Sequence, residues 1–188
     1  PANDPDFQIG GSLGLGVADV VYASASFTMS REAAVTLDDP DDSGTKVLKG
    51  DLLTVSISDA TLFIGTGASL DTLSTSATYG KVELPADTAP DAVGFFAENG
   101  TLDLAIFTAT KRVDGATETD LGVAQKYTGL QASLGRAGLQ GIEAVTLIAT
   151  DLSLKLNQNA MDDPATTVVE TGALLNWSAL DADATGLE

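Results

Sequence analysis

Residues 53–64, LTVSISDATLFI, decide the fold class of this chain. The first half alternates Leu, Val and Ile with Thr and Ser, which is the pattern of a strand with one buried face. After Asp59 the parity changes, so that Leu62 and Ile64 become the apolar positions. Both halves can face one interior if the chain bends at the polar residue between them. We therefore interpret Asp59 as a corner between two strands.

The same pattern recurs twice along the chain. Residues 95–106 change parity at Asn99, and residues 145–156 change parity at Asp151. Three units of strand, polar corner and strand predict an all-β fold, a parallel β-helix-like β-solenoid whose cornered coils stack as in a repeat protein. The alternative is a β-sandwich, because Asp114-Gly115 and the pair Asn99-Gly100 are also typical of two-residue hairpins.

Composition indicates one acidic domain. The chain has 188 residues, is 44% hydrophobic but only 5% aromatic, and contains 19 Gly, so we expect a single β-rich domain over residues 1–188. Its net charge of −18 disfavours nucleic acid and anionic membranes as partners, because both require clustered cations. The same carboxylates are hard oxygen ligands, which makes Ca²⁺ the candidate ion.

Missing residue types exclude several chemistries. The chain contains no Cys and no His, so neither a Ser-His-Asp nor a Cys-His arrangement can form within it. No stretch reaches the roughly 18 apolar residues of a membrane-spanning helix, and we predict no membrane insertion. Because the sequence does not start with Met, we expect a fragment of a longer protein.

Residues 127–159 carry a resemblance to a known family. The runs YTGLQA (127–132), GIEAVTL (141–147) and ATDLSLKLNQ (149–158) resemble a tandem repeat of very large bacterial surface or secreted proteins. Those proteins are adhesin-like and often carry calcium-binding domains of the RTX kind. The resemblance implies one repeat unit over residues 17–160, with the ends belonging to neighbouring copies of the same chain. It also implies an extracellular or cell-surface location.

Two oxygen-rich loops are the candidate metal sites. Asp39, Asp41 and Ser43 are spaced as in the opening of a D-x-D-x-[DNS]-G calcium loop, which places alternate oxygens inward. Asn157, Asp162 and Asp163 supply oxygens in a second loop. Solvated acidic turns are the alternative interpretation of both.

Few residues suggest catalysis or ligand binding. Lys111, Arg112 and Arg136 are the cations that a polysaccharide lyase would use, and solvated charges at strand ends are the alternative. Trp177 is the single Trp; it could form a sugar-binding platform or cap the end of the core.

We conclude that the sequence favours a structural, non-enzymatic module of a large extracellular bacterial protein, acting as a stalk or adhesive fibre segment. Its expected partners are neighbouring repeats, surface glycans or other cells. A carbohydrate-binding β module and a polysaccharide-active β-helix enzyme are the alternatives.

Overall fold

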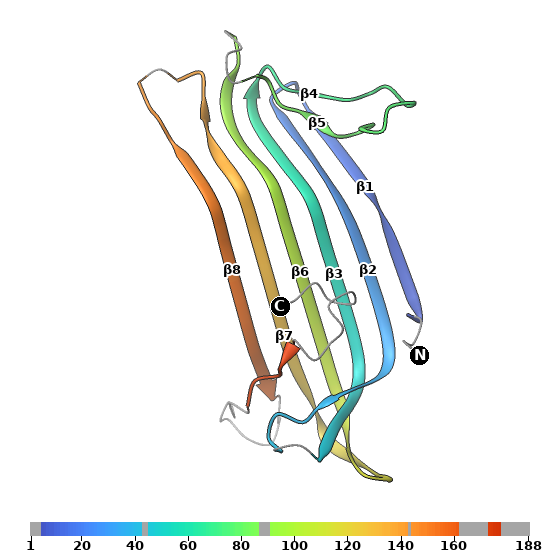
Figure 1. Cartoon of the computed structure of the whole chain (residues 1–188). Helices are drawn as coiled ribbons and strands as arrows, with labels where there is room; N and C mark the ends of the chain where they lie inside the picture. The colour runs from blue at the N-terminus through green and yellow to red at the C-terminus, as the bar shows by residue number, and fades with distance from the viewer. Residues whose placement is uncertain (1–4, 43–44, 87–90, 143, 162–172, 178–188) are drawn as a thin grey trace.

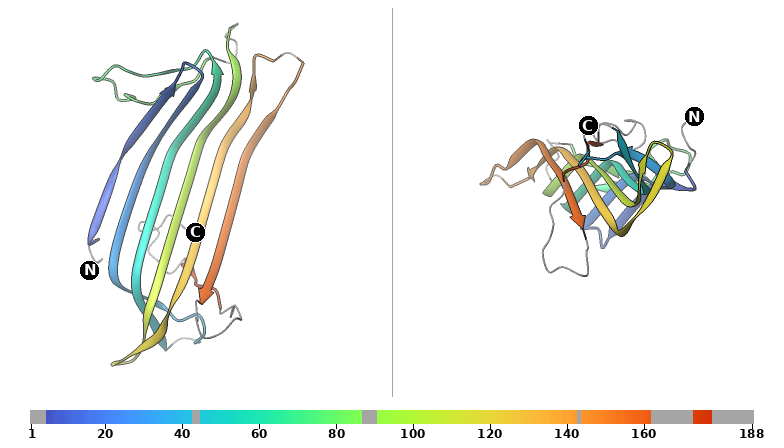
Figure 2. Two further views of the ribbon diagram at one scale, coloured as in Figure 1. Left: turned by 180° about the vertical axis from the view of Figure 1, so that it is seen from behind. Right: turned by 90° about the horizontal axis from the view of Figure 1, so that it is seen from below.

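The chain forms a single curved layer of long antiparallel strands (Figures 1 and 2). The computed structural model describes residues 5–42, 45–86, 91–142, 144–161 and 173–177. Within them a six-stranded sheet has the order β1-β2-β3-β6-β7-β8, and β4 pairs with β5 in a small second sheet. The strands are β1 (Phe7–Val17), β2 (Val21–Asp38), β3 (Lys46–Thr66), β4 (Ser69–Leu70), β5 (Val82–Glu83), β6 (Val93–Asp114), β7 (Thr117–Gln140) and β8 (Ile148–Met161).

The prediction of a parallel β-solenoid with cornered coils is wrong. Every pairing in the sheet is antiparallel, and each strand lies beside the next long strand along the chain. The six long strands also lie in one layer, which differs from the sandwich alternative (Figure 2). A two-residue hairpin lies where it was expected near Asp114-Gly115, but its turn residues are Gly115 and Ala116, since Asp114 pairs with Thr117. Asn99-Gly100 instead lies inside β6.

The three predicted corners lie inside strands that continue past them. Asp59 and Asn99 lie at register shifts between β3 and its neighbours, whereas β8 pairs with β7 on both sides of Asp151 without a shift. Asp59, Asn99 and Asp151 have φ of 53°, 56° and 53°, a left-handed conformation that Asn and Asp tolerate better than most residues. Each adds one residue to its strand, and at Asp59 and Asn99 this shifts the pairing with a neighbouring strand, as a bulge does. The change of parity in the sequence is therefore real, but the strand continues past it.

The bulges keep the apolar residues on one side of the sheet. Ile57 pairs with Phe27, and Leu62 pairs with Ala23. Phe27 and Ala23 are four residues apart on β2 and therefore point to the same face. Consequently Ile57 and Leu62 share that face although an odd number of residues separates them.

The two faces of the sheet differ in what covers them. One face, here called the polar face, carries the C-terminal residues 173–177 and the hairpin of β4 and β5 (Figure 1). Two buried clusters lie on it, one at each end of the sheet, around Phe107 and Phe63. Between them the surface is made of Ser and Thr pairs, including Ser30 with Thr54 at 2.6 Å and Thr101 with Ser133 at 2.7 Å. The opposite face is apolar.

The bulge geometry can be tested at Asn99. A β-branched residue is strained at this φ, so we expect Asn99→Val to lower the free energy of unfolding by about 1–2 kcal/mol. Asn99→Gly is the matched control, since Gly adopts positive φ without a steric penalty. Urea denaturation measures both variants, and an equal loss in the two would contradict the bulge assignment.

Candidate functional site

The first acidic loop is organised around a buried ion pair. Asp39 follows β2 and is 2% exposed. Its carboxylate accepts hydrogen bonds from the Arg112 side chain of β6 and from the backbone N–H of Asp41, the latter at 3.1 Å. A buried charge is tolerated when it is paired and hydrogen-bonded in this way. Nearby, a hydrogen bond from Lys46 at 2.8 Å lowers the pKa of the Asp42 carboxyl.

Residues from both predicted metal sites hold the C-terminal segment, although Asn157 lies within β8 and not in a loop. The Asp41 carboxylate accepts a hydrogen bond from the backbone N–H of Ala173 at 3.2 Å. Asn157 donates through its amide to the carbonyl of Leu175 at 3.0 Å. Its amide oxygen accepts from the indole N–H of Trp177, also at 3.0 Å. These side chains therefore clamp residues 173–177 across the polar face.

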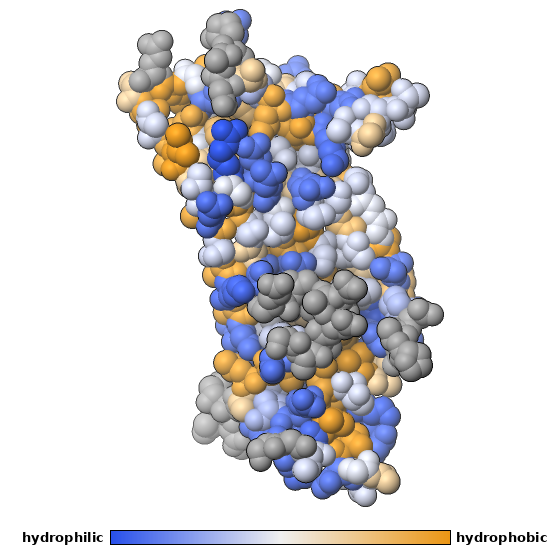
Figure 3. Space-filling model, in the orientation of Figure 1, coloured by the Kyte–Doolittle hydropathy of each residue, from blue (hydrophilic) through white to orange (hydrophobic). Residues whose placement is uncertain are grey.

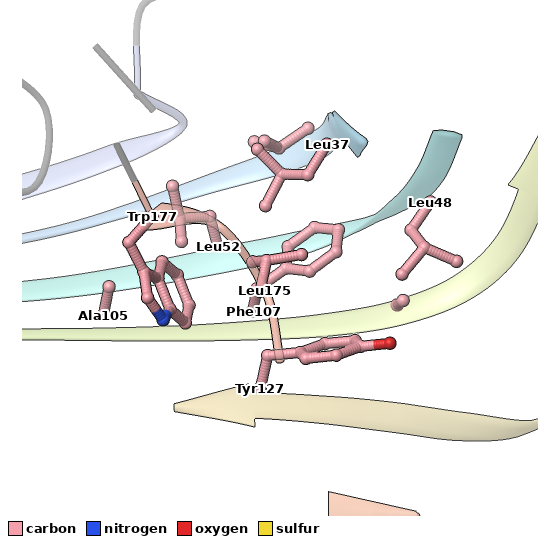
Figure 4. Packing of buried hydrophobic residues seen from close by; sticks show 10 residues of the cluster. Leu37, Leu48, Leu52, Ala105, Phe107, Tyr127, Leu175 and Trp177 are labelled. Atoms are coloured by element: carbon pink, nitrogen blue, oxygen red, sulfur yellow. The ribbon is translucent and has the colours of Figure 1, made fainter. Parts of the chain in front are cut away.

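Trp177 caps the larger buried cluster, as one of its two interpretations predicted. It is 7% exposed and packs with Leu175 over Phe107 and Tyr127 (Figure 4). Its indole lies directly on Gly129 of β7, where an added Cβ would come within 2.7 Å of the ring. Because the indole is enclosed, it is not presented as a flat sugar-binding platform.

Tyr127 lies in the same cluster and is fully buried. Its hydroxyl donates to the Gln125 amide oxygen at 3.0 Å. Burial, with smaller contributions from the charges of Asp41 and Asp39, raises the pKa of the Tyr127 hydroxyl to about 12. The residue therefore stays neutral near neutral pH and serves as a packing group.

The structure places the predicted metal ligands in two different situations. Asp39, Asp41 and Asn157 all have hydrogen-bond partners within the protein. Ser43, Asp162 and Asp163 lie outside the described residues. Among the residues that are described, no three or more Asp, Glu, His or Cys side chains gather into a group that could hold a metal ion. The calcium prediction therefore stays a prediction.

The three candidate catalytic cations occupy separate ion pairs. Lys111 binds Glu118 at 3.2 Å, and Arg112 binds Asp39. Arg136 binds Glu98 at 2.5 Å, and its guanidinium lies 4.7 Å from the centre of the Phe96 ring. Arg112 lies near one end of the sheet and Arg136 near the other, so these cations do not converge on one cleft.

A groove lies on the polar face beside the β4–β5 hairpin. It has a volume of about 320 Å³, and its lining combines polar residues such as Ser12 and Asp71 with apolar ones such as Leu13 and Leu70, and includes Tyr79. Lys81 reaches Asp59 across it at 3.5 Å. Figure 3 shows this side of the molecule, where hydrophilic and neutral side chains separate apolar patches near the two ends.

The apolar face is the most extensive feature of the structure. Backbone pairing aligns apolar and Gly residues into five successive rows that cross the sheet. From the N-terminal end of β1 the first two rows are Ile9-Met29-Val55-Leu104-Leu130-Leu156 and Gly11-Phe27-Ile57-Leu102-Ala132-Leu154. The third consists of Leu13-Ala25 and Ala60-Gly100-Leu134-Leu152, which meet at the register shift between Ser24 and Ser26. The last two are Leu15-Ala23-Leu62-Ala97-Ala137-Ala149 and Val17-Val21-Ile64-Phe95-Leu139. Leu13 and Leu154 at the two edges are 64% and 59% exposed.

A shallow groove of about 350 Å³ crosses the middle of this face. Its floor is built from small residues, among them Ala25, Ala60 and Gly100, and larger side chains such as Leu13 and Leu134 form its walls. Gly100 lies close to Ala60, since an added Cβ would come within 3.1 Å of the Ala60 Cβ. The sequence analysis missed this surface, although the alternation of each strand signalled it.

Charged groups border the apolar face at the end that carries the β2–β3 connection. Arg31 binds Asp51 at 2.7 Å there. Lys49 and Lys111 share Glu118, at 2.6 Å and 3.2 Å, and these hydrogen bonds lower the pKa of the Glu118 carboxyl. The described residues contain no helix long and apolar enough to cross a membrane.

The calcium prediction can be tested by thermal melting. Calcium at about 100 times its Kd would add ~2.7 kcal/mol to stability, which corresponds to a rise in Tm of roughly 5–10 °C. We expect Asp163→Asn to reduce this rise, whereas Asp103→Asn, on the polar face away from both loops, should not. The same Tm in calcium and in EDTA would contradict the prediction.

No protein-family model, no curated protein and no solved structure matches this chain.

Proposed function

We propose that this chain is a non-catalytic structural module of a large extracellular bacterial protein, and that neighbouring copies join edge to edge into one extended sheet. The observation that carries the proposal is the pair of open edges. Within the described residues, β1 and β8 each pair on one side only. Each therefore presents a row of backbone N–H and C=O groups that can pair with another strand.

The number of strands makes this joining simple. Because the sheet has six antiparallel strands in sequence order, its first and last strands run in opposite directions. A second copy in the same orientation therefore brings its β1 antiparallel to β8 of the first copy. The apolar rows also stay on one side, provided that the register continues, since each edge strand contributes apolar residues to them.

The charge of the chain suits a module outside the cell that must stay soluble. A net charge of −18 keeps copies from collapsing onto one another through their polar surfaces. The chain lacks His and Cys, and the cations considered for catalysis are engaged in separate ion pairs. These features support a structural role over an enzymatic one.

Hydrogen exchange on a tandem of two copies tests the edge joining. Segmental isotope labelling distinguishes the identical peptides of the two copies by mass. We expect slow amide exchange in β8 of the first copy and β1 of the second, because pairing protects backbone amides. The outer β1 and β8 serve as internal controls and should exchange as they do in the single chain. Equal exchange at all four edges would sink the proposal.

A carbohydrate-binding module is the second candidate, and the groove of about 320 Å³ on the polar face favours it. Tyr79, 58% exposed at this groove, is an aromatic side chain on which a sugar ring could stack. This alternative predicts a specific hit on a glycan array that Tyr79→Ala abolishes. The structural role predicts no hit on the array. Leu73→Ala is the control for Tyr79→Ala, because Leu73 lies in the same β4–β5 connection but does not line the groove.

A further inference from the structure

The chemistry of the apolar face restricts what can cover it. The lining of its groove consists mostly of Ala, Leu, Ile and Gly, together with Ser24 and Thr61. The Ser24 hydroxyl accepts a hydrogen bond from the Val82 backbone on the polar face, so it is not offered to an occupant of the groove. Such a surface offers almost no hydrogen-bond partner, so a peptide in an extended conformation would lose its bonds to water without replacement. A suitable occupant therefore presents an apolar surface whose own backbone groups are already paired.

The size of the face matches a stable protein interface. The face is about 27 Å long along the strands, from Ile9 to Val17, and about 24 Å wide across the six strands. Treated as flat, it covers on the order of 650 Å², and protruding side chains add to this area. Isolated apolar patches on monomeric proteins reach about 300–600 Å², and a standard interface buries ~800 Å² per partner. The area is thus larger than a monomer usually exposes and close to what a dimer needs.

The relief of the face is complementary to itself. On β2, β3 and β6 the first two rows are bulky, with Phe27, Ile57 and Leu104 among them. The next two rows on the same strands contain the small residues of the groove floor, Ala25 and Gly100 among them. A two-fold axis between the second and third rows would place the bulky half of one sheet over the hollow half of another. Isologous packing requires such a mutual fit.

A lipid bilayer suits this face less well. Inserting the face into hydrocarbon would bring the unpaired backbone groups along β1 and β8 into contact with lipid chains, which cannot hydrogen-bond to them. A second sheet leaves the edges at the rim, in water. The ion pairs of Arg31 and Lys49 also fall outside the first row and would form the polar rim of the interface.

We propose that the apolar face binds the same face of a second copy of this chain, giving a dimer of two packed sheets. The two sheets lie ~10 Å apart in this dimer, and the bulky rows of each sheet fill the groove of the other. This inference concerns the face and the proposed function concerns the edges, so that either can fail without the other.

Sedimentation velocity of the purified chain tests the dimer. We expect a species of twice the 19.1 kDa chain mass and a dimer affinity that Ala25→Arg weakens at least tenfold. Ser26→Arg is the matched control. Ser26 follows Ala25 in the sequence, but its side chain lies on the polar face, beside Ser12, and so outside the proposed interface. A monomer at all concentrations, or equal weakening by both variants, would overturn the proposal.

Cysteine cross-linking tests the arrangement without depending on a disruptive variant. The natural chain has no Cys, so a mixture of Ile57→Cys and Ala60→Cys chains reports a defined contact. We expect the mixed disulfide to form several-fold more than either self-linked product. Absence of any linked species overturns the proposal. Flotation of a monomeric chain with phosphatidylcholine vesicles overturns it in favour of a lipid surface.

Discussion

The rest of the structure depends on one extra residue that neighbouring strands insert at the same level of the sheet. Because side chains alternate between the faces with a period of two, an added residue would turn half of a strand inside out unless a bulge absorbs it or the next strand adds one too. In β3 and β6 the insertion coincides with Asp59 and Asn99, which adopt the left-handed conformation that a bulge needs. On β7, Gly135 lies against Asn99, where a Cβ would approach to 2.9 Å. β7 and β8 follow β6 at this level without a register shift, and β2, which has no extra residue there, meets Asp59 through a bulge. One apolar face therefore survives across the sheet.

Much of the fold could be predicted from local pattern, and the part that could not is non-local. Alternation located the strands, and the change of parity located Asp59, Asn99 and Asp151 correctly. A parity change reports one extra residue, and this is equally compatible with a corner and with a bulge in a continuing strand. Which strand lies beside β3 is decided by pairing with β2 and β6, tens of residues away. That information is absent from any single window of sequence, and the solenoid interpretation failed there.

The candidate site was predictable to a similar degree. The spacing of Asp39 and Asp41 predicted a calcium loop, but the partner of Asp39 in the structure is Arg112, which lies 73 residues away. Likewise, the oxygen of Asn157 that was assigned to a metal accepts the indole N–H of Trp177. Metal loops and structural clamps use the same oxygen atoms, and the distinction depends on which donors the fold brings to them. Burial of Asp39 makes its pairing obligatory, since an uncompensated charge there would be strongly destabilising.

The natural twist of a β-sheet determines the shape of an assembly that is joined through the open edges. Adjacent strands rotate by roughly 20–25° relative to one another, so the six steps from β1 of one module to β1 of the next accumulate about 120–150°. Modules joined along β1 and β8 would therefore form a helical ribbon that completes a turn about every two and a half to three copies. The apolar face would trace a continuous spiral stripe along such a ribbon. Two ribbons could bury that stripe only by winding around each other, so the pitch of the assembly is already encoded in the twist of one sheet.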